Sequence, residues 1–137
     1  TSSAYGTGGI VGWVRYNGTT ANYPVKNVIS VTGNTNCGAV SGGNDAGGII
    51  GTVYNLGKIN DNKNFAETLS SGNFTAGIVG NAQFTETAIG MTEPNSVEVK
   101  NNVSTTPLES ITGSCKDLYV YINNKEYVMA ENNRTAE

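Results

Sequence analysis

Hydrophobic and polar positions alternate over short distances in this chain, and one short pattern occurs three times. The copies are Gly8-Gly9-Ile10-Val11-Gly12, Gly47-Gly48-Ile49-Ile50-Gly51 and Ala76-Gly77-Ile78-Val79-Gly80. Each copy is followed by a few residues whose second position is apolar, and then by a variable loop rich in asparagine. Recurrence of one short unit is typical of repeat architectures. The pattern predicts a unit made of an apolar strand, a Ser/Gly turn, the glycine-flanked strand and a loop.

A unit of this kind is too thin to bury its own apolar side, whereas stacked units bury a continuous core. The sequence therefore predicts an all-β fold, namely a short β-solenoid or β-helix-like stack of about three coils. The first two copies lie further apart than the last two, which places an insertion at Asn17 to Asn27. The alternative is an antiparallel β-sandwich, in which the same strands pair as hairpins.

The expected organisation is a single domain over residues 1–137, with the glycine-motif repeats in 1–116. Residues 117–130 have a different character, because two aromatic and β-branched stretches, Leu118–Ile122 and Glu126–Met129, flank an Asn-Asn-Lys turn. Asparagine tolerates the positive φ of a tight turn, so this segment is predicted to form a β-hairpin that caps the edge of the stack. Residues 131–137 are polar and are expected to form a flexible tail.

The motif glycines are expected to be structural, because a residue without Cβ allows tight corners and close approach of neighbouring coils. These glycines are Gly9, Gly12, Gly48, Gly51, Gly77 and Gly80. Ile49 is expected in the core of the central coil. Strand alternation would turn the next position of each motif, Val11, Ile50 and Val79, outward. We expect either a loop over this apolar column or a bend that buries both branched residues. An uncovered column would instead mark a contact with another domain or chain.

The composition of the chain limits the classes of partner that it is expected to bind. Charged residues make up 14 % of the chain and the net charge is −3, with no cluster of Lys or Arg, which argues against nucleic acid. No stretch approaches the about 20 apolar residues of a membrane span, so membrane insertion is not expected. Low charge and abundant Asn, Thr and Gly are typical of a secreted or cell-surface protein. Cys37 and Cys115 are expected either to form one disulfide or to be buried free thiols.

The three glycine motifs resemble the GLUG motif, a short repeat of large bacterial surface proteins, adhesins and the non-catalytic parts of some IgA-specific metallopeptidases. The upstream segment Asn36-Cys37-Gly38-Ala39-Val40-Ser41-Gly42 is similar to the one that precedes the motif there, and the resemblance covers residues 8–84. The third copy departs from the pattern with Ala76, which is also small. The resemblance implies a β-solenoid element of an extracellular bacterial protein, and it carries no catalytic residue onto this chain.

The residues offer little for catalysis. The chain has no histidine, so a Ser-His-Asp triad and a His-Glu-x-x-His site are excluded. Glycoside cleavage would need paired carboxylates, and the candidates are Asp45, Asp61, Glu67 and Asp117. These four residues do not fall at equivalent repeat positions, so we interpret them as scattered surface charges. The segment 41–48 resembles one copy of a calcium-binding nonapeptide, but such sites need stacked copies, and a plain turn is preferred. We expect no enzyme activity, no cofactor and no metal.

Binding is the function that the residues favour. Trp13, Tyr16 and Tyr54 follow the glycine motifs directly. Exposed aromatic rings beside asparagine suit carbohydrate, whereas the alternative is that they pack under the long loops. We expect a non-catalytic adhesion or ligand-binding module of a bacterial surface protein, with a host glycan or an extracellular protein as partner. The alternative is a structural spacer or assembly subunit that contacts neighbouring domains of the same polypeptide and has no ligand of its own.

Overall fold

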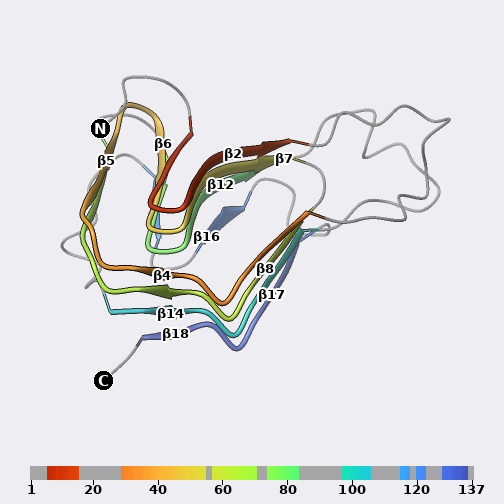
Figure 1. Ribbon diagram of the computed structural model, residues 1–137. Coiled ribbons are helices and arrows are strands. Elements are labelled where there is room, and N and C mark those ends of the chain that lie inside the picture. The colour runs from red at the N-terminus through yellow and green to blue at the C-terminus, as the bar shows by residue number, and fades with distance from the viewer. Residues whose placement is uncertain are drawn as a thin grey trace, which may run out of the picture.

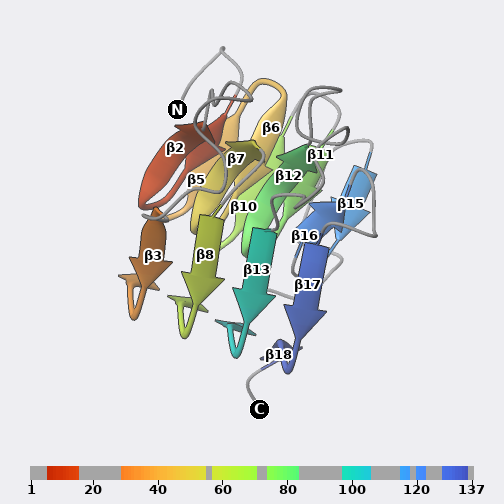
Figure 2. The same ribbon diagram turned by 90° about the vertical axis from the view of Figure 1, so that its right-hand side faces the viewer.

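The computed structural model describes residues 6–15, 29–54, 57–70, 74–83, 97–105, 115–117, 120–122 and 128–135. Within these ranges every regular element is a β-strand, and the chain visits the same sheets in the same order again and again. Viewed as in Figure 1, equivalent strands of successive coils lie nearly over one another, and Figure 2 shows them side by side. The all-β prediction is confirmed.

Five sheets make up the stack, named here in the order in which the chain passes through them. Sheet I contains β1 (Thr7–Gly8), β6 (Asp45–Gly47), β11 (Phe74–Ala76) and β15 (Cys115–Asp117). Sheet II contains β2 (Val11–Arg15), β7 (Ile50–Tyr54), β12 (Val79–Gln83) and β16 (Val120–Ile122). Sheet III contains β3 (Ser30–Thr32), β8 (Gly57–Asn60), β13 (Val97–Lys100) and β17 (Val128–Glu131). Sheet IV contains β4 (Thr35–Asn36), β9 (Lys63–Asn64), β14 (Val103–Ser104) and β18 (Arg134–Thr135), and sheet V contains β5 (Val40–Gly42) and β10 (Thr68–Ser70).

All strand pairs among the described residues are parallel. The register repeats the glycine motif from coil to coil, since Val11 pairs with Ile50, Ile50 with Val79, and Val79 with Val120. These parallel sheets are compatible with a solenoid-like stack, and the alternative of an antiparallel sandwich is wrong for the described strands. The four-stranded sheets give four coils where about three were expected. The expected insertion at 17–27 falls between β2 and β3, outside the described residues.

The predicted C-terminal hairpin is wrong. Strand β16 pairs with β12 in sheet II, and β17 pairs with β13 in sheet III, both in parallel. The two strands therefore form the last edges of two different sheets, β17 in continuous register with β13 and β16 with a shift in register between its pairs with Val79 and Ala82. The predicted flexible tail is also corrected, since Glu131 ends β17 and Arg134–Thr135 forms β18 on β14.

The glycine motif is a bend between two sheets and not a single strand. In the second coil β6 ends at Gly47 and β7 begins at Ile50, and the backbone N–H groups of Ile49 and Ile50 both donate to the carbonyl of Ile78 at 3.1 and 2.9 Å. The bend breaks the strand alternation, so Ile49, Ile50, Ile78 and Val79 are all fully buried. This is the second of the two expected solutions for the apolar column. In the first coil Ile10 is 42 % exposed, because no described coil precedes it.

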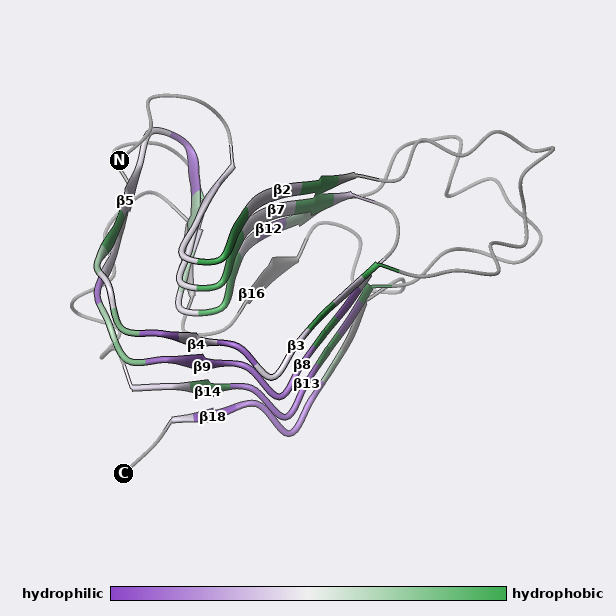
Figure 3. Cartoon of the chain, viewed as in Figure 1, coloured by the Kyte–Doolittle hydropathy of each residue, from purple (hydrophilic) through white to green (hydrophobic). Residues whose placement is uncertain are grey.

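The apolar core lies where sheets II and III face one another, next to the glycine bends. Its members are Val14, Val31, Ile49, Ile50, Val53, Ile59, Ile78, Val79, Ala82, Val97 and Val99, with Val11 packed against them. Ile49 is fully buried, as predicted. Figure 3 shows the hydrophobic colour on the bends and on sheet II, and the hydrophilic colour along β9 and the corner before it. The interior is thus apolar on one side and polar on the other.

Candidate functional site

The polar side of the interior begins at the corner between sheets III and IV. One residue of each coil adopts a left-handed backbone conformation there: Gly33 (φ 71°), Asp61 (59°), Asn101 (56°) and Asn132 (55°). Glycine, asparagine and aspartate are the residues that adopt this conformation most readily. An asparagine follows directly in every coil, at positions 34, 62, 102 and 133. The corner therefore places one amide side chain above another through the whole stack.

These four asparagines form a continuous hydrogen-bonded ladder. The Nδ2 group of Asn34 donates to Oδ1 of Asn62 at 3.1 Å, Asn62 donates in the same way to Asn102 at 3.1 Å, and Asn102 donates to Asn133 at 2.8 Å. The Oδ1 atoms of Asn62, Asn102 and Asn133 also accept the backbone N–H of the ladder asparagine one coil earlier. From the second coil on, Nδ2 additionally donates backward to a carbonyl of the preceding coil, at 2.8 Å in all three cases. Every step of the ladder runs in the same direction, with forward donation to Oδ1.

Sequence reasoning missed this ladder. In the sequence, the ladder corresponds to a pair of residues: one that tolerates positive φ, and an Asn directly after it. This pair recurs at separations of 28, 40 and 31 residues. Unequal loops hide this recurrence, because the separation changes from coil to coil. Asn102-Val103-Ser104 also matches an N-glycosylation sequon, but Asn102 is fully buried and its amide is engaged in the ladder. The asparagines that a sequence pattern assigns to turns and surface are here part of the interior.

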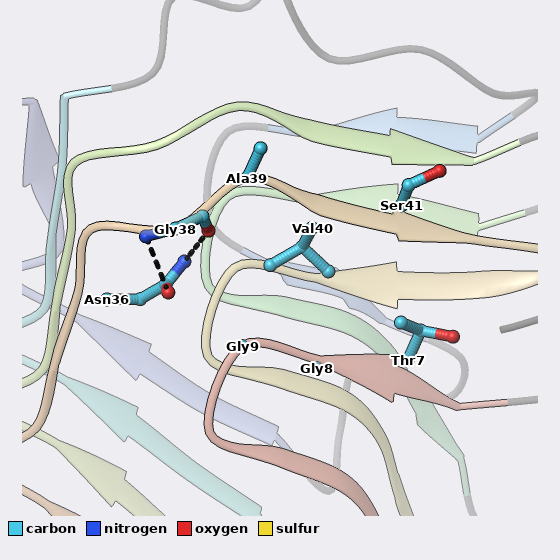
Figure 4. Close-up of a pocket in the computed structure, with 8 residues that line it drawn as sticks. All are labelled: Thr7, Gly8, Gly9, Asn36, Gly38, Ala39, Val40 and Ser41. Atoms are coloured by element: carbon cyan, nitrogen blue, oxygen red, sulfur yellow. Dashed lines mark hydrogen bonds between the residues drawn. The ribbon is translucent and has the colours of Figure 1, made fainter. Parts of the chain in front are cut away.

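A second asparagine in the first two coils shapes the corner between sheets IV and V. The amide of Asn36 donates to the carbonyl of Gly38 at 2.9 Å and accepts its N–H at 3.2 Å (Figure 4). Asn64 makes the same pair of bonds with Ala66, at 3.1 and 3.3 Å. Asn36 also donates to Oδ1 of Asn64 at 3.0 Å. This second column lies against the glycine bends, where a Cβ at Gly48 would collide with the Asn64 amide.

A pocket of about 230 Å³ opens beside this corner in the first coil (Figure 4). Its lining consists of small and uncharged residues: Thr7, Gly8, Gly9, Asn36, Gly38, Ala39, Val40 and Ser41. Such a lining offers hydroxyl and amide hydrogen bonds and no titratable group. The pocket lining therefore contains no general acid or base, and no group that would activate the hydroxyls of Thr7 and Ser41 as nucleophiles.

The motif glycines are positioned where backbone approaches backbone. A Cβ at Gly51 would meet the backbone of Gly6, Thr7 and Gly12, and one at Gly80 would meet the backbone of Ala46 and Gly51. Added Cβ atoms at Gly9, Gly12 and Gly48 would likewise come within 3 Å of other atoms. Gly77 is buried at the corresponding bend of the third coil. These contacts explain why the motif carries glycine at its second and last positions.

Two of the three aromatic residues proposed for binding lie together. Trp13 on β2 is 51 % exposed, and the half-buried Tyr54 on β7 lies beside it, with ring centroids 5.9 Å apart and ring planes at 58°. The pairing of β2 with β7 sets Trp13 next to Thr52 in the neighbouring coil. Tyr54 lies two residues further along β7, at a diagonal position from Trp13. Tyr16, the third residue proposed, lies outside the described residues.

The carboxylates do not converge. Asp45 on β6 is only 4 % exposed, and its Oδ2 accepts hydrogen bonds from Thr52 Oγ1 at 2.7 Å and Asn81 Nδ2 at 3.2 Å. It ties sheet I to sheet II, so the interpretation as a surface charge is wrong for this residue. Asp61 and Glu67 are exposed and lie on other parts of the coil, and Asp117 ends β15. Within the described ranges no group of three or more Cys, Asp or Glu side chains could hold a metal ion.

Cys37 carries a free thiol and is exposed. It therefore forms neither the disulfide nor the buried thiol that were the two expectations for it. Cys115 lies on β15 in sheet I, three coils further along the stack. In the part of the chain that the structure describes, no helix has the length and hydropathy needed to cross a membrane.

Comparison of the chain with protein-family models, with curated proteins and with solved structures finds no match in any of the three. The geometry described above therefore carries the functional inference by itself.

Proposed function

We propose that this chain is a non-catalytic binding module of an extracellular bacterial surface protein, a β-solenoid of the kind that its glycine motifs resemble, and that it takes carbohydrate on Trp13. Three features support the proposal. They are the exposed indole of Trp13 beside Tyr54, the small and uncharged lining of the pocket in the first coil, and the separation of the carboxylates. Carbohydrate is recognised by flat apolar rings together with neutral hydrogen-bonding groups.

The single observation that carries the proposal is the exposure of Trp13. Burial of a tryptophan removes a large apolar area from water, so an indole that is 51 % exposed leaves much of that stabilisation unused in the isolated fold. Tyr54 contacts the indole from the next coil and restricts its orientation. A ring that is held in place before binding loses little side-chain entropy when a ligand stacks on it.

The test uses the fact that Trp13 is the only tryptophan of the chain. Neutral gluco-, manno-, galacto- and N-acetylglucosamine oligosaccharides are titrated into the protein while the indole fluorescence is followed, and hits are repeated by calorimetry. We expect a saturable change with at least one class. Trp13→Ala should weaken binding about tenfold or more, equivalent to roughly 1.4 kcal/mol, because the stacking surface is lost. Trp13→Phe, which keeps a ring, should weaken it less.

Phe65→Ala is the matched control. Phe65 is also an exposed ring, at 46 %, but it follows β9 on a different side of the coil. Its removal should leave the affinity unchanged. Equal losses in Trp13→Ala and Phe65→Ala, or no saturable signal with any of the sugars from folded protein, would refute carbohydrate binding at Trp13.

A structural spacer without a ligand is the alternative function. The observation that favours it is the asparagine ladder, which runs without interruption through all four coils and stiffens the stack along its axis. In that case the oligosaccharide titrations stay flat, and Trp13→Ala changes neither binding nor stability by a measurable amount.

A further inference from the structure

The stack has two open ends among the described strands. In the first coil β1, β2, β3 and β4 are the outermost strands of their sheets, and in the last coil β15, β16, β17 and β18 are outermost. An outermost strand presents a row of unpaired N–H and C=O groups that can template a further strand. All described strand pairs are parallel, so the strands at the first coil and those at the last coil run in the same direction.

The asparagine ladder makes these two ends complementary. At the first coil, Oδ1 of Asn34 accepts no hydrogen bond from the described residues. Its Nδ2 donates to the Thr32 carbonyl of the same coil at 3.2 Å, where the later coils use a carbonyl of the preceding described coil. At the last coil, the backbone N–H of Asn133 and the forward position of its amide have no described ladder partner. At the first coil, the Asn34 oxygen thus lacks described donors, and at the last coil, the donor groups of Asn133 lack a described acceptor.

The apolar column beside the ladder is also unfinished at the last coil. The inward positions of sheet III are Val31, Ile59, Val99 and Ala130, in register. The first three are buried, whereas Ala130 is exposed. Its carbonyl occupies the place that corresponds to those of Val31, Ile59 and Val99, each of which accepts the amide of a later coil.

We propose that a second copy of this chain docks head to tail on the stack, with its first coil placed on the last coil of the first copy. Asn133 of one copy then donates to Oδ1 of Asn34 in the next, and the Asn34 amide turns from its own Thr32 carbonyl to that of Ala130. Val31 covers Ala130. Since each ladder step runs in one direction, stacking first coil on first coil would not supply the missing donors. The contact is heterologous and leaves both outer ends open, so it produces filaments of no set length.

The outward column next to the ladder provides a charge test. It consists of Thr32, Asn60, Lys100 and Glu131 in register, and Lys100 Nζ lies 3.3 Å from Glu131 Oε2, so side chains in this column reach their neighbours. In the proposed assembly, Thr32 of one copy lies next to Glu131 of the other. Within its own chain the exposed Thr32 has only the neutral Asn60 as its column neighbour.

Thr32→Glu and Thr32→Lys therefore form a matched pair for sedimentation velocity over a wide range of protein concentration. The unchanged protein should show an average mass that rises with concentration without a limiting stoichiometry. Thr32→Glu should weaken association about fivefold through repulsion from Glu131, whereas Thr32→Lys should keep or strengthen it. The difference should shrink in high salt. Circular dichroism and urea unfolding of both variants check that they fold alike.

A crosslinking experiment tests the register. In a background that carries both Cys37→Ser and Cys115→Ser, Thr32→Cys and Glu131→Cys proteins are mixed and oxidised, and a heterodimer is expected that neither gives alone. Thr35→Cys with Glu131→Cys, which is out of register, should crosslink far less. A chain that stays monomeric up to about 1 mM, equal association of the Glu and Lys variants, or crosslinks that ignore register would each overturn the proposal.

Discussion

At the scale of single residues, the ladder asparagines use both halves of their amide. Asn102 accepts two hydrogen bonds from Asn62 at Oδ1, and its Nδ2 donates to the Ile59 carbonyl and to Asn133. An aspartate would lack the donors, and an apolar residue would leave the neighbouring coils unpaired. Because Asn62 and Asn102 are both fully buried, water cannot replace the hydrogen bonds between them.

Asn102→Ala and Asn34→Ala should therefore differ in cost. Asn102→Ala leaves buried groups of two coils without partners and is expected to lower the free energy of unfolding by about 2–4 kcal/mol. Asn34 is half-buried at the open end, where water can replace it, so Asn34→Ala should cost less than about 1 kcal/mol. Urea unfolding of both variants measures the difference, and equal costs would contradict a stabilising ladder.

At the scale of elements, the glycine bend joins two parallel sheets within two residues. Gly48 lies where the bend approaches both the Asn64 amide and the carbonyl of Gly77, so its second motif position has no room for a methyl group. The first motif position is equally close in the first two coils, where a Cβ at Gly47 would meet the Ile50 carbonyl, whereas the third coil carries Ala76 there. The feature that recurs in the first three coils is thus a close contact at the bend and not a strand of a particular length.

Gly48→Ala should lower the free energy of unfolding by about 1–3 kcal/mol, because overpacking a closed contact forces the backbone to shift. Gly38→Ala is the matched control: it lies on the same corner, is exposed, and a Cβ there would meet only Asn36 Oδ1 at 3.8 Å. It should leave the stability unchanged or raise it by up to about 1 kcal/mol. Thermal and urea unfolding that fail to separate the two variants would speak against the close approach at Gly48.

At the scale of the whole molecule, stability depends on stacking and not on any one coil. The buried branched residues of the second and third coils, such as Ile49 and Ile78, contact residues from sheets II and III of neighbouring coils. Each coil supplies a thin layer, and only adjacent layers complete its burial. The exposure of Ile10 in the first coil and Ala130 in the last is the visible consequence of this arrangement.

Ile49→Ala should then cost about 2–5 kcal/mol, the usual range for truncating a large buried aliphatic side chain. Ile29→Ala provides a control with the same chemical change, because Ile29 is 46 % exposed just before β3. It should shift the stability by less than about 0.5 kcal/mol. An Ile49→Ala effect below about 1 kcal/mol would remove Ile49 from the core.

The aromatic pair follows from the sequence pattern, whereas the asparagine ladder does not. Trp13 and Tyr54 both follow glycine motifs, and the stacking of β2 on β7 brings the two segments together, with Tyr54 two positions beyond the Thr52 that pairs with Trp13. The sequence pattern does not predict the burial of Asp45, because this depends on Thr52 from the next strand of its own coil and on Asn81 from the following coil. The ladder was missed because an Asn after a turn residue has the same local pattern as an exposed loop.

The sequence alone determined the features that depend on local recurrence: the all-β composition, the stacked repeats, the structural glycines and the burial of Ile49. Only the tertiary structure decided where the C-terminal strands pair and what the corner asparagines do. Strands β16 and β17 have the local pattern of a hairpin, yet they pair in parallel with the third coil. The physical reason is that parallel pairing and the ladder join residues 28 to 43 positions apart, and local propensity contains no information on such partners.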